Sequence, residues 1–127
     1  MAGRLTLSTL NNDTGVLATQ NGMTGIAKAW VNFNGTGTVA IRDSFNVSSI
    51  TDNGTGQYTI NFTTAMPNTN YVFNGATAWT SGQPSGIVGS GTGDGSFTTS
   101  SLRIYVLGNG SDALIDVSTC MVSIFSS

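Results

Sequence analysis

The sequence predicts an all-β fold: a jelly-roll-like antiparallel β-sandwich of about seven or eight strands with a short N-terminal arm. Apolar and polar residues alternate with period two in several segments, as they do in strands with one buried face. Runs rich in Asn and Gly, which favour tight turns, separate these segments at intervals of about 8–12 residues. The chain is also rich in Thr and Ser, which suit strands and turns better than helices, and no window has helical periodicity.

The 127 residues correspond to one domain. We expect residues 1–22 to form the arm and residues 23–127 to form the sandwich. Leu5 and Leu7 alternate with polar residues before the NNDTG run interrupts the pattern. The arm either frays, as leading residues often do, or becomes ordered against a neighbouring subunit. As an assembly element it would use Arg4, Leu5, Leu7 and Leu10.

The strand pattern is clear from Gly25 onward. Within Gly25–Phe33, Ala29 and Val31 fall on one face and Trp30 falls on the other. Further strands are expected at Thr38–Asp43, Phe45–Ile50, Gln57–Thr63, Tyr71–Trp79, Ser96–Leu107 and Ile115–Phe125, with a short edge segment around Ile87-Val88. The expected connections are a hairpin turn at Asn34-Gly35, a TDNGTG loop after Ile50 and a GNGSD hairpin after Leu107.

The longest glycine-rich stretch, Ser81–Gly95, is expected to form a loop. Long loops in compact domains often bind a partner, but this one is equally well interpreted as a plain connection. Trp79 borders the loop, and an aromatic ring beside amide and carboxylate groups is typical of lectin sites. The receptor contacts would then be Trp79, Gln83 and Asp94. Trp30 is a second candidate for stacking on a sugar, and the alternative is that both tryptophans fill a core or a subunit interface.

The composition excludes several functional classes. The chain has no His, so it lacks the commonest general base and metal ligand, and triads that require His are impossible. Its four basic residues are scattered and its net charge is −2, which argues against nucleic-acid binding. We expect no cofactor and no metal; the alternative is calcium held by Asp94, or by Asp52 with loop carbonyls, but there is no EF-hand spacing. The absence of a secretory signal and of a long apolar run predicts synthesis in a cytoplasm and no membrane insertion.

Carboxylates and the single cysteine give little sign of chemistry. Glycosidases need two carboxylates, and the available pairs are Asp43 with Asp52 and Asp112 with Asp116. Aspartates in turns usually accept hydrogen bonds from their own backbone, so we expect no catalytic residues and no enzyme. Cys120 lies in an apolar strand pattern and is expected to be buried and inert.

A long block within Gly25–Phe73, AKAWVNFNGTGTVAIRDSFNVSSITDNGTG, resembles a module in virion proteins of tailed phages that infect aquatic bacteria, often of the tail-fibre-like type. The closing CMVSIF is similar to the C-terminal strand of that family. The resemblance implies a β-domain that forms homotrimers and carries no catalytic residues. A tail fibre usually holds this module after a long stalk. The short arm here leads us to expect a decoration protein, a fibre-tip subunit or a receptor-binding unit docked on an adaptor.

These observations predict a non-enzymatic virion structural protein, an oligomeric surface module that decorates or stabilises the particle as a capsid decoration or a tail or fibre component. Its partners would be itself and other virion proteins. Charged residues make up only 8% of the chain, which leaves little electrostatic protection against association. The alternative is a receptor-binding, lectin-like module that recognises a host surface glycan.

Overall fold

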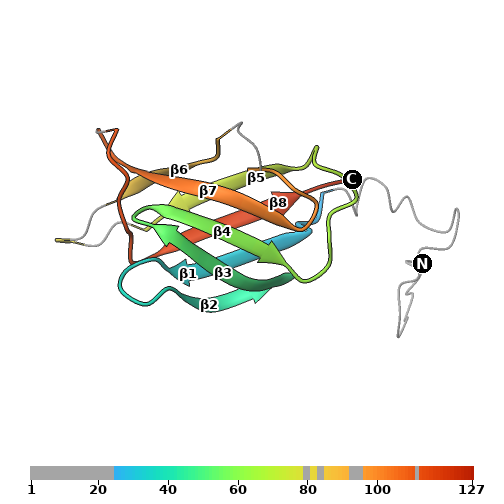
Figure 1. Ribbon diagram of the computed structural model, residues 1–127, viewed down its shortest axis with the longest axis horizontal. Helices are drawn as coiled ribbons and strands as arrows, with labels where there is room; N and C mark the ends of the chain where they lie inside the picture. Colours follow the sequence, from blue (N-terminus) through green and yellow to red (C-terminus); the bar gives the residue numbers. More distant parts are fainter. Residues whose placement is uncertain (1–24, 79–80, 83–84, 92–95, 111) are drawn as a thin grey trace, which may run out of the picture.

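The computed structural model describes residues 25–78, 81–82, 85–91, 96–110 and 112–127, and these residues form an all-β structure (Figure 1). The predicted arm therefore lies outside the described residues. The strands of the described part are β1 (Ala29–Asn34), β2 (Ala40–Phe45), β3 (Val47–Gly54), β4 (Gln57–Phe62), β5 (Val72–Thr77), β6 (Gly86–Gly89), β7 (Ser101–Gly108) and β8 (Cys120–Phe125).

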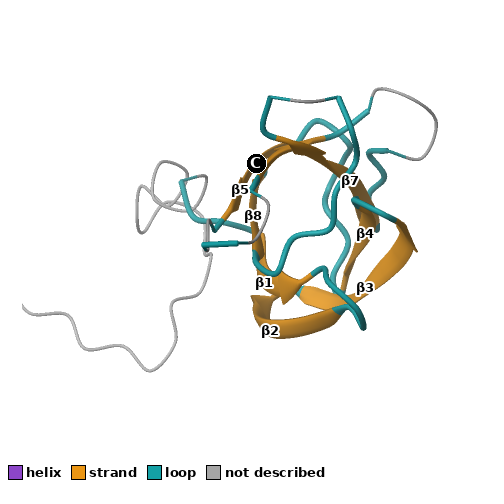
Figure 2. Cartoon of the chain, turned by 90° about the vertical axis from the view of Figure 1, so that its left-hand side faces the viewer, coloured by secondary structure: helices purple, strands orange, loops and turns teal. Residues whose placement is uncertain are grey.

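The eight strands of the described part form two four-stranded sheets in which all neighbours are antiparallel. Sheet A has the order β2-β1-β8-β5 and sheet B the order β3-β4-β7-β6. Viewed from the end in Figure 2, the two sheets face each other around the core. The antiparallel β-sandwich predicted from the alternation is thus confirmed.

The core lies between the sheets and is built by alternation along each strand. In β1 the buried residues are Ala29, Val31 and Phe33, and in β4 they are Tyr58, Ile60 and Phe62, as the pattern predicts. Phe33 from sheet A packs edge-to-face on Tyr58 from sheet B, with ring centroids 5.1 Å apart. Such pairs contribute about 0.5–1.5 kcal/mol beyond the stabilisation that comes from burying their surface, so this contact helps to hold the sheets together.

The two sheets are joined covalently at Asn46, the single residue between β2 and β3. Its backbone has φ of +55°, a left-handed conformation that asparagine tolerates better than most residues. Its side-chain amide donates to the carbonyl oxygens of Lys28 and Thr64, each at 3.0 Å, and its Oδ1 accepts from the Thr64 N–H at 2.7 Å. Asn46 therefore fixes the corner where the chain passes from one sheet to the other.

The opposite edges of the sheets meet between β5 and β6. The Thr77 hydroxyl donates to the Gly86 carbonyl at 2.8 Å and accepts from the Gly86 N–H at 2.9 Å. Gly75 allows this close approach, because a Cβ at that position would lie 2.6 Å from Cβ of Val88. The short edge segment expected around Ile87-Val88 is present as β6, paired with β7.

Three expected connections differ from those in the structure. The hairpin after Asn34 is not a two-residue turn but a loop over residues 35–39, closed by the Asn34 side chain, which bonds the backbone of Thr36. Strand β3 continues to Gly54, so most of the TDNGTG segment is strand. The GNGSD segment does turn the chain back, since Leu107 and Leu114 form an antiparallel bridge. The expected hairpin of two long strands is wrong, because β7 pairs with β4 and β6 whereas β8 pairs with β1 and β5.

The last of these differences has a local cause. Residues 113–115 return alongside the end of β7, where the Gly108 N–H donates to the Ala113 carbonyl at 2.9 Å and the Ile115 N–H donates to the Val106 carbonyl at 3.0 Å. The chain then crosses to sheet A, and strand β8 begins at Cys120 instead of Ile115. The Asp116 carboxylate holds this crossing in place by accepting hydrogen bonds from the Tyr58 hydroxyl at 2.7 Å and the Gly56 N–H at 2.8 Å.

Among the described residues there is no helix of the length and hydropathy that a membrane span requires.

Candidate functional site

The outer face of sheet B is polar and its side chains bond to one another. The Asn61 amide donates to the hydroxyls of Ser49 and Thr51, each at 3.0 Å, and the Asn53 amide donates to the Thr59 hydroxyl at 2.7 Å. Farther along the same face, an Arg103 guanidinium N–H donates to Gln57 Oε1 at 2.9 Å, and the guanidinium lies over the Tyr105 ring. Most of the polar groups on this face are therefore committed to the fold.

The outer face of sheet A has a different character. Strand register places Trp30 of β1 beside Ser123 of β8, and Ser123 beside Asn74 of β5. The next row runs from Asn32 through Met121 to Ala76. These six side chains line a shallow groove of about 400 Å³, which we call the Trp30 groove. Its walls combine an indole and a thioether with two amides and a hydroxyl.

The polar groups of the Trp30 groove are mostly not used by the fold. The Asn74 amide and the Ser123 hydroxyl make no hydrogen bond to any other described residue. Asn32 accepts one bond, from Arg42 Nη1 to its Oδ1 at 3.3 Å. Arg42 also donates to the Ser118 carbonyl and the Thr119 hydroxyl, so its guanidinium is anchored and turns the Asn32 amide nitrogen away from it. The groove thus presents hydrogen-bonding groups that are available to a ligand.

A second apolar surface lies at the end of the sandwich on the right of Figure 1, where the described residues begin at Gly25 and where the C-terminus lies. Strand β2 ends here at Phe45, β5 begins here at Val72, and Ile26 leads into β1. The exposed fractions of Ile26, Phe45 and Val72 are 59%, 53% and 62%. A hollow of about 350 Å³ lies between Ile26, Phe45 and Met66. We call this surface the basal end.

The sequence-predicted contact residues divide into two groups. Trp79, Gln83 and Asp94 lie outside the described residues, as do the four arm residues Arg4, Leu5, Leu7 and Leu10. Both sets remain predictions. Trp30 is described, and the interpretation that it fills the core is wrong, because it stands on the outer face of sheet A with 37% of its surface exposed.

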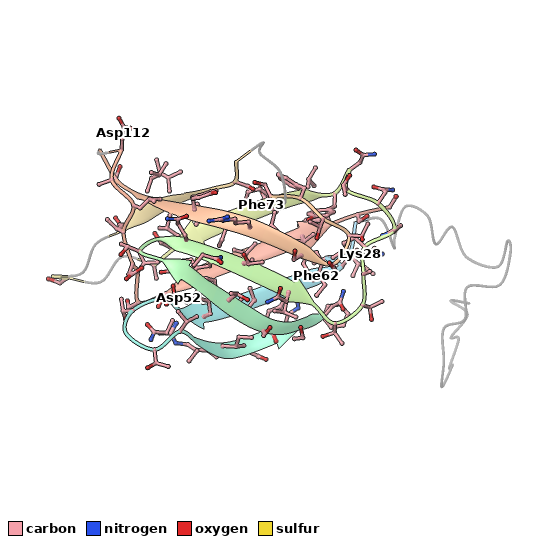
Figure 3. The ribbon with its side chains drawn as sticks, viewed as in Figure 1. Lys28, Asp52, Phe62, Phe73 and Asp112 are labelled. Carbon is pink, nitrogen blue, oxygen red and sulfur yellow. The ribbon has the colours of Figure 1, made fainter. Side chains whose placement is uncertain are left out.

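The aspartate pairs weighed for catalysis are not arranged as pairs of free carboxylates. Asp52 accepts from the Gly54 N–H at 2.9 Å and Asp43 from the Ser44 N–H at 2.9 Å, as expected for aspartates that bond their own backbone. Asp116 is bound to Tyr58 and Gly56, whereas Asp112 projects from the loop after β7 (Figure 3). No group of three or more Cys or Asp side chains that could hold a metal ion occurs among the described residues.

The titratable groups of the core are held protonated by burial. Burial raises the pKa of the Tyr71 hydroxyl to about 12, and burial together with the hydrogen bond to Asp116 raises the pKa of Tyr58. Burial also raises the pKa of the Cys120 thiol to about 12. The prediction that the thiol is buried is confirmed, and its raised pKa is the opposite of what nucleophilic cysteines need.

No family model, curated protein or solved structure matches the chain. Function is therefore inferred from the residues of the two surfaces. Sequence reasoning missed Asn32, Asn74 and Met121 as a group, because they reach one groove only through the pairing of β8 with both β1 and β5. The alternation of polar and apolar residues within each strand was the one available signal, and it marked the outward-facing positions without showing which strands are neighbours.

Proposed function

We propose that the protein is a non-enzymatic structural module that assembles through its basal end and is carried on a bacteriophage virion. The observation that carries the assembly part is the exposure of Ile26, Phe45 and Val72 at one end of the sandwich, where Ile26 and Phe45 line the same hollow and Val72 begins the other edge strand of sheet A. Large apolar side chains that are more than half exposed mark interaction surfaces when they gather in one patch. The patch lies where the chain preceding Gly25 joins the sandwich, so attachment there leaves the rest of the module facing outward.

The partners of this surface are further copies of the chain, as a homotrimer, and neighbouring virion proteins of the capsid or tail. The net charge of −2 provides little repulsion between copies. The resemblance of the Gly25–Phe73 block to phage virion modules supports a particle as the setting. The role on that particle is decoration or stabilisation, because the described carboxylates are engaged by the fold or stand apart.

The assembly is tested by measuring molar mass in solution at micromolar concentration for the wild type and two variants. Phe45→Thr/Val72→Thr removes two apolar side chains while keeping residues that suit strands. We expect the wild type to be a trimer and the double variant a monomer. Burying what is exposed of these two side chains contributes about 2–4 kcal/mol per interface. Its loss weakens association by about two orders of magnitude.

Ile87→Thr is the matched control. Ile87 lies on the edge strand of sheet B and is 62% exposed, the same fraction as Val72, but it is not part of the basal end. The control variant is expected to remain a trimer. A monomeric wild type that is not retained on purified particles would overturn the proposal. An equal loss of mass in Ile87→Thr would show that the assembly surface is not the basal end.

A further inference from the structure

We propose that the Trp30 groove is a binding site for neutral saccharides, one or two sugar rings in size. The groove borders the basal end, because Trp30 pairs with Phe45 of β2, but the inference uses the other side of Trp30, toward Ser123 and Asn74, and does not rest on the assembly proposed above. The groove volume of about 400 Å³ lies within the range of about 300–1,000 Å³ that is usual for small-molecule sites. What identifies the ligand class is the combination of side chains in the groove and the state of their hydrogen bonds.

The indole of Trp30 supplies the surface for a sugar ring. One face of a pyranose ring presents C–H groups with a slight positive charge, and the face of an aromatic ring is negative. Trp30 lies within strand β1 rather than at a loop tip, with Ser123 beside it and Met121 in the next row. With 37% of Trp30 and 36% of Met121 exposed, both side chains are accessible yet supported by their neighbours.

The polar groups of the groove match the hydroxyls of a sugar. Ser123 lies one strand from Trp30 and Asn74 lies two strands away, at about 5 and 10 Å given the usual strand spacing. A hydroxyl and an amide can each donate and accept, which is what sugar hydroxyls require. Asn32 adds a donor of fixed direction, because its Oδ1 is held by Arg42 and its amide nitrogen is turned the other way.

Other ligand classes fit less well. An apolar peptide side chain or a lipid tail would bury the amides of Asn32 and Asn74 without partners, at a cost of about 1–3 kcal/mol for each group. A phosphorylated ligand needs free positive charge, whereas the described residues that line the groove include no charged side chain, and the nearby Arg42 is engaged by Asn32, Ser118 and Thr119. A neutral saccharide can stack its C–H face on the Trp30 indole and can form hydrogen bonds to the amides with its hydroxyls.

The site differs from the one predicted from sequence at Trp79, and a single experiment distinguishes them. The probes are methyl glycosides of glucose, galactose and mannose, with lactose, maltose and cellobiose, titrated into the protein while amide chemical shifts are recorded by NMR. A ligand of this size in an open groove is expected to bind with a dissociation constant of about 1–10 mM. The shifts that move should be those of Trp30, Asn74 and Ser123.

Variants then assign the binding to particular side chains. Trp30→Ala is expected to weaken binding at least tenfold, whereas Trp30→Phe retains an aromatic face and recovers part of it. Asn74→Ala should weaken binding about fivefold. Asn61→Ala is the matched control, because it removes an asparagine from the outer face of sheet B and should leave binding unchanged. The far-ultraviolet circular dichroism of each variant checks that it is folded.

Three outcomes would overturn the proposal. The first is no binding of any probe at about 50 mM, well above the expected range. The second is binding that survives in Trp30→Ala but is lost in Trp79→Ala, which would move the site to the glycine-rich stretch. The third is movement of the groove shifts on dilution of the Phe45→Thr/Val72→Thr variant without sugar, which would identify a second copy of the chain as the occupant of the groove. Loss of binding in Trp30→Ala with Trp79→Ala unaffected supports it.

Discussion

The outer faces of the two sheets use the same kinds of residues in opposite ways. On sheet B, Asn61 and Asn53 bond to hydroxyls of the neighbouring strand. On sheet A, the side chains of Asn74 and Ser123 have no hydrogen-bond partner among the described residues and lie in the same row as an exposed tryptophan. An asparagine count would rate the two faces alike. The two faces differ in whether their asparagine amides are hydrogen-bonded within the fold. Bonded amides stabilise sheet B, whereas unbonded amides on sheet A are available to a ligand.

The largest predicted effect is a fall in stability at high pH, and it comes from the inner faces of the sheets. It tests whether the two sheets, which differ on their outer faces, contribute alike to the core. Sheet A contributes Cys120 to the core and sheet B contributes Tyr58; burial raises the pKa of both. These groups are neutral in the folded protein, whereas the unfolded chain loses their protons above about pH 9–10. Stability is therefore fully present below pH 9 and falls as the pH rises toward about 12.

The expected loss is about 1 kcal/mol per pH unit from the thiol alone, with the tyrosines adding to it above pH 10. The measurement is urea denaturation between pH 7 and 11. Cys120→Ala lowers stability at pH 7 by leaving a small cavity, but its stability should fall less steeply between pH 9 and 10. A wild type whose stability is constant up to pH 11 would mean that these groups are not buried as described.

The next largest effect is predicted at Asn46, where the two sheets join. Asn46→Ala removes three side-chain hydrogen bonds and leaves alanine at a positive φ, so the free energy of unfolding should fall by about 2–3 kcal/mol. Asn46→Gly removes the same bonds but tolerates the backbone conformation, and should be about 1 kcal/mol less harmful. Equal losses in the two variants, measured by urea denaturation, would contradict a role for the left-handed backbone.

Much of the fold follows from alternation along the sequence, because side-chain direction in a strand depends only on local geometry. The buried sets in β1, β4 and β7 are the ones that the pattern predicts. The prediction that the two strands on either side of GNGSD pair along their length was wrong for an equally physical reason, because the chain returns beside β7 only as far as Ile115. Two strands close in sequence usually form a hairpin, but Asp116 bonds to Tyr58 and Gly56, almost sixty residues away, and directs the chain across to the other sheet.

The candidate sites were less predictable than the fold. The Trp30 groove exists because β8 is inserted between β1 and β5, which brings Asn74 and Ser123 to Trp30 from distant parts of the sequence. The basal end likewise depends on where β2 ends and β5 begins in space. Local patterns show that these side chains face outward, but only long-range pairing shows that they are neighbours.

The smallest predicted effect is the most direct test of the comparison between the two outer faces. Asn61→Ala removes two bonds between β4 and β3, so it should lower the free energy of unfolding by about 0.5–1 kcal/mol. Asn74→Ala removes no bond to a described residue, and alanine fits a strand at least as well as asparagine, so its stability should stay within about 0.5 kcal/mol of wild type. Both are measured by urea denaturation of paired samples. If Asn74→Ala were the more harmful change, Asn74 would belong to the fold, and the Trp30 groove would lose the free amide on which its affinity for saccharides depends. If Asn61→Ala is the more harmful change, urea denaturation and the saccharide titration together distinguish the asparagine that stabilises the fold from the asparagine proposed to bind sugar.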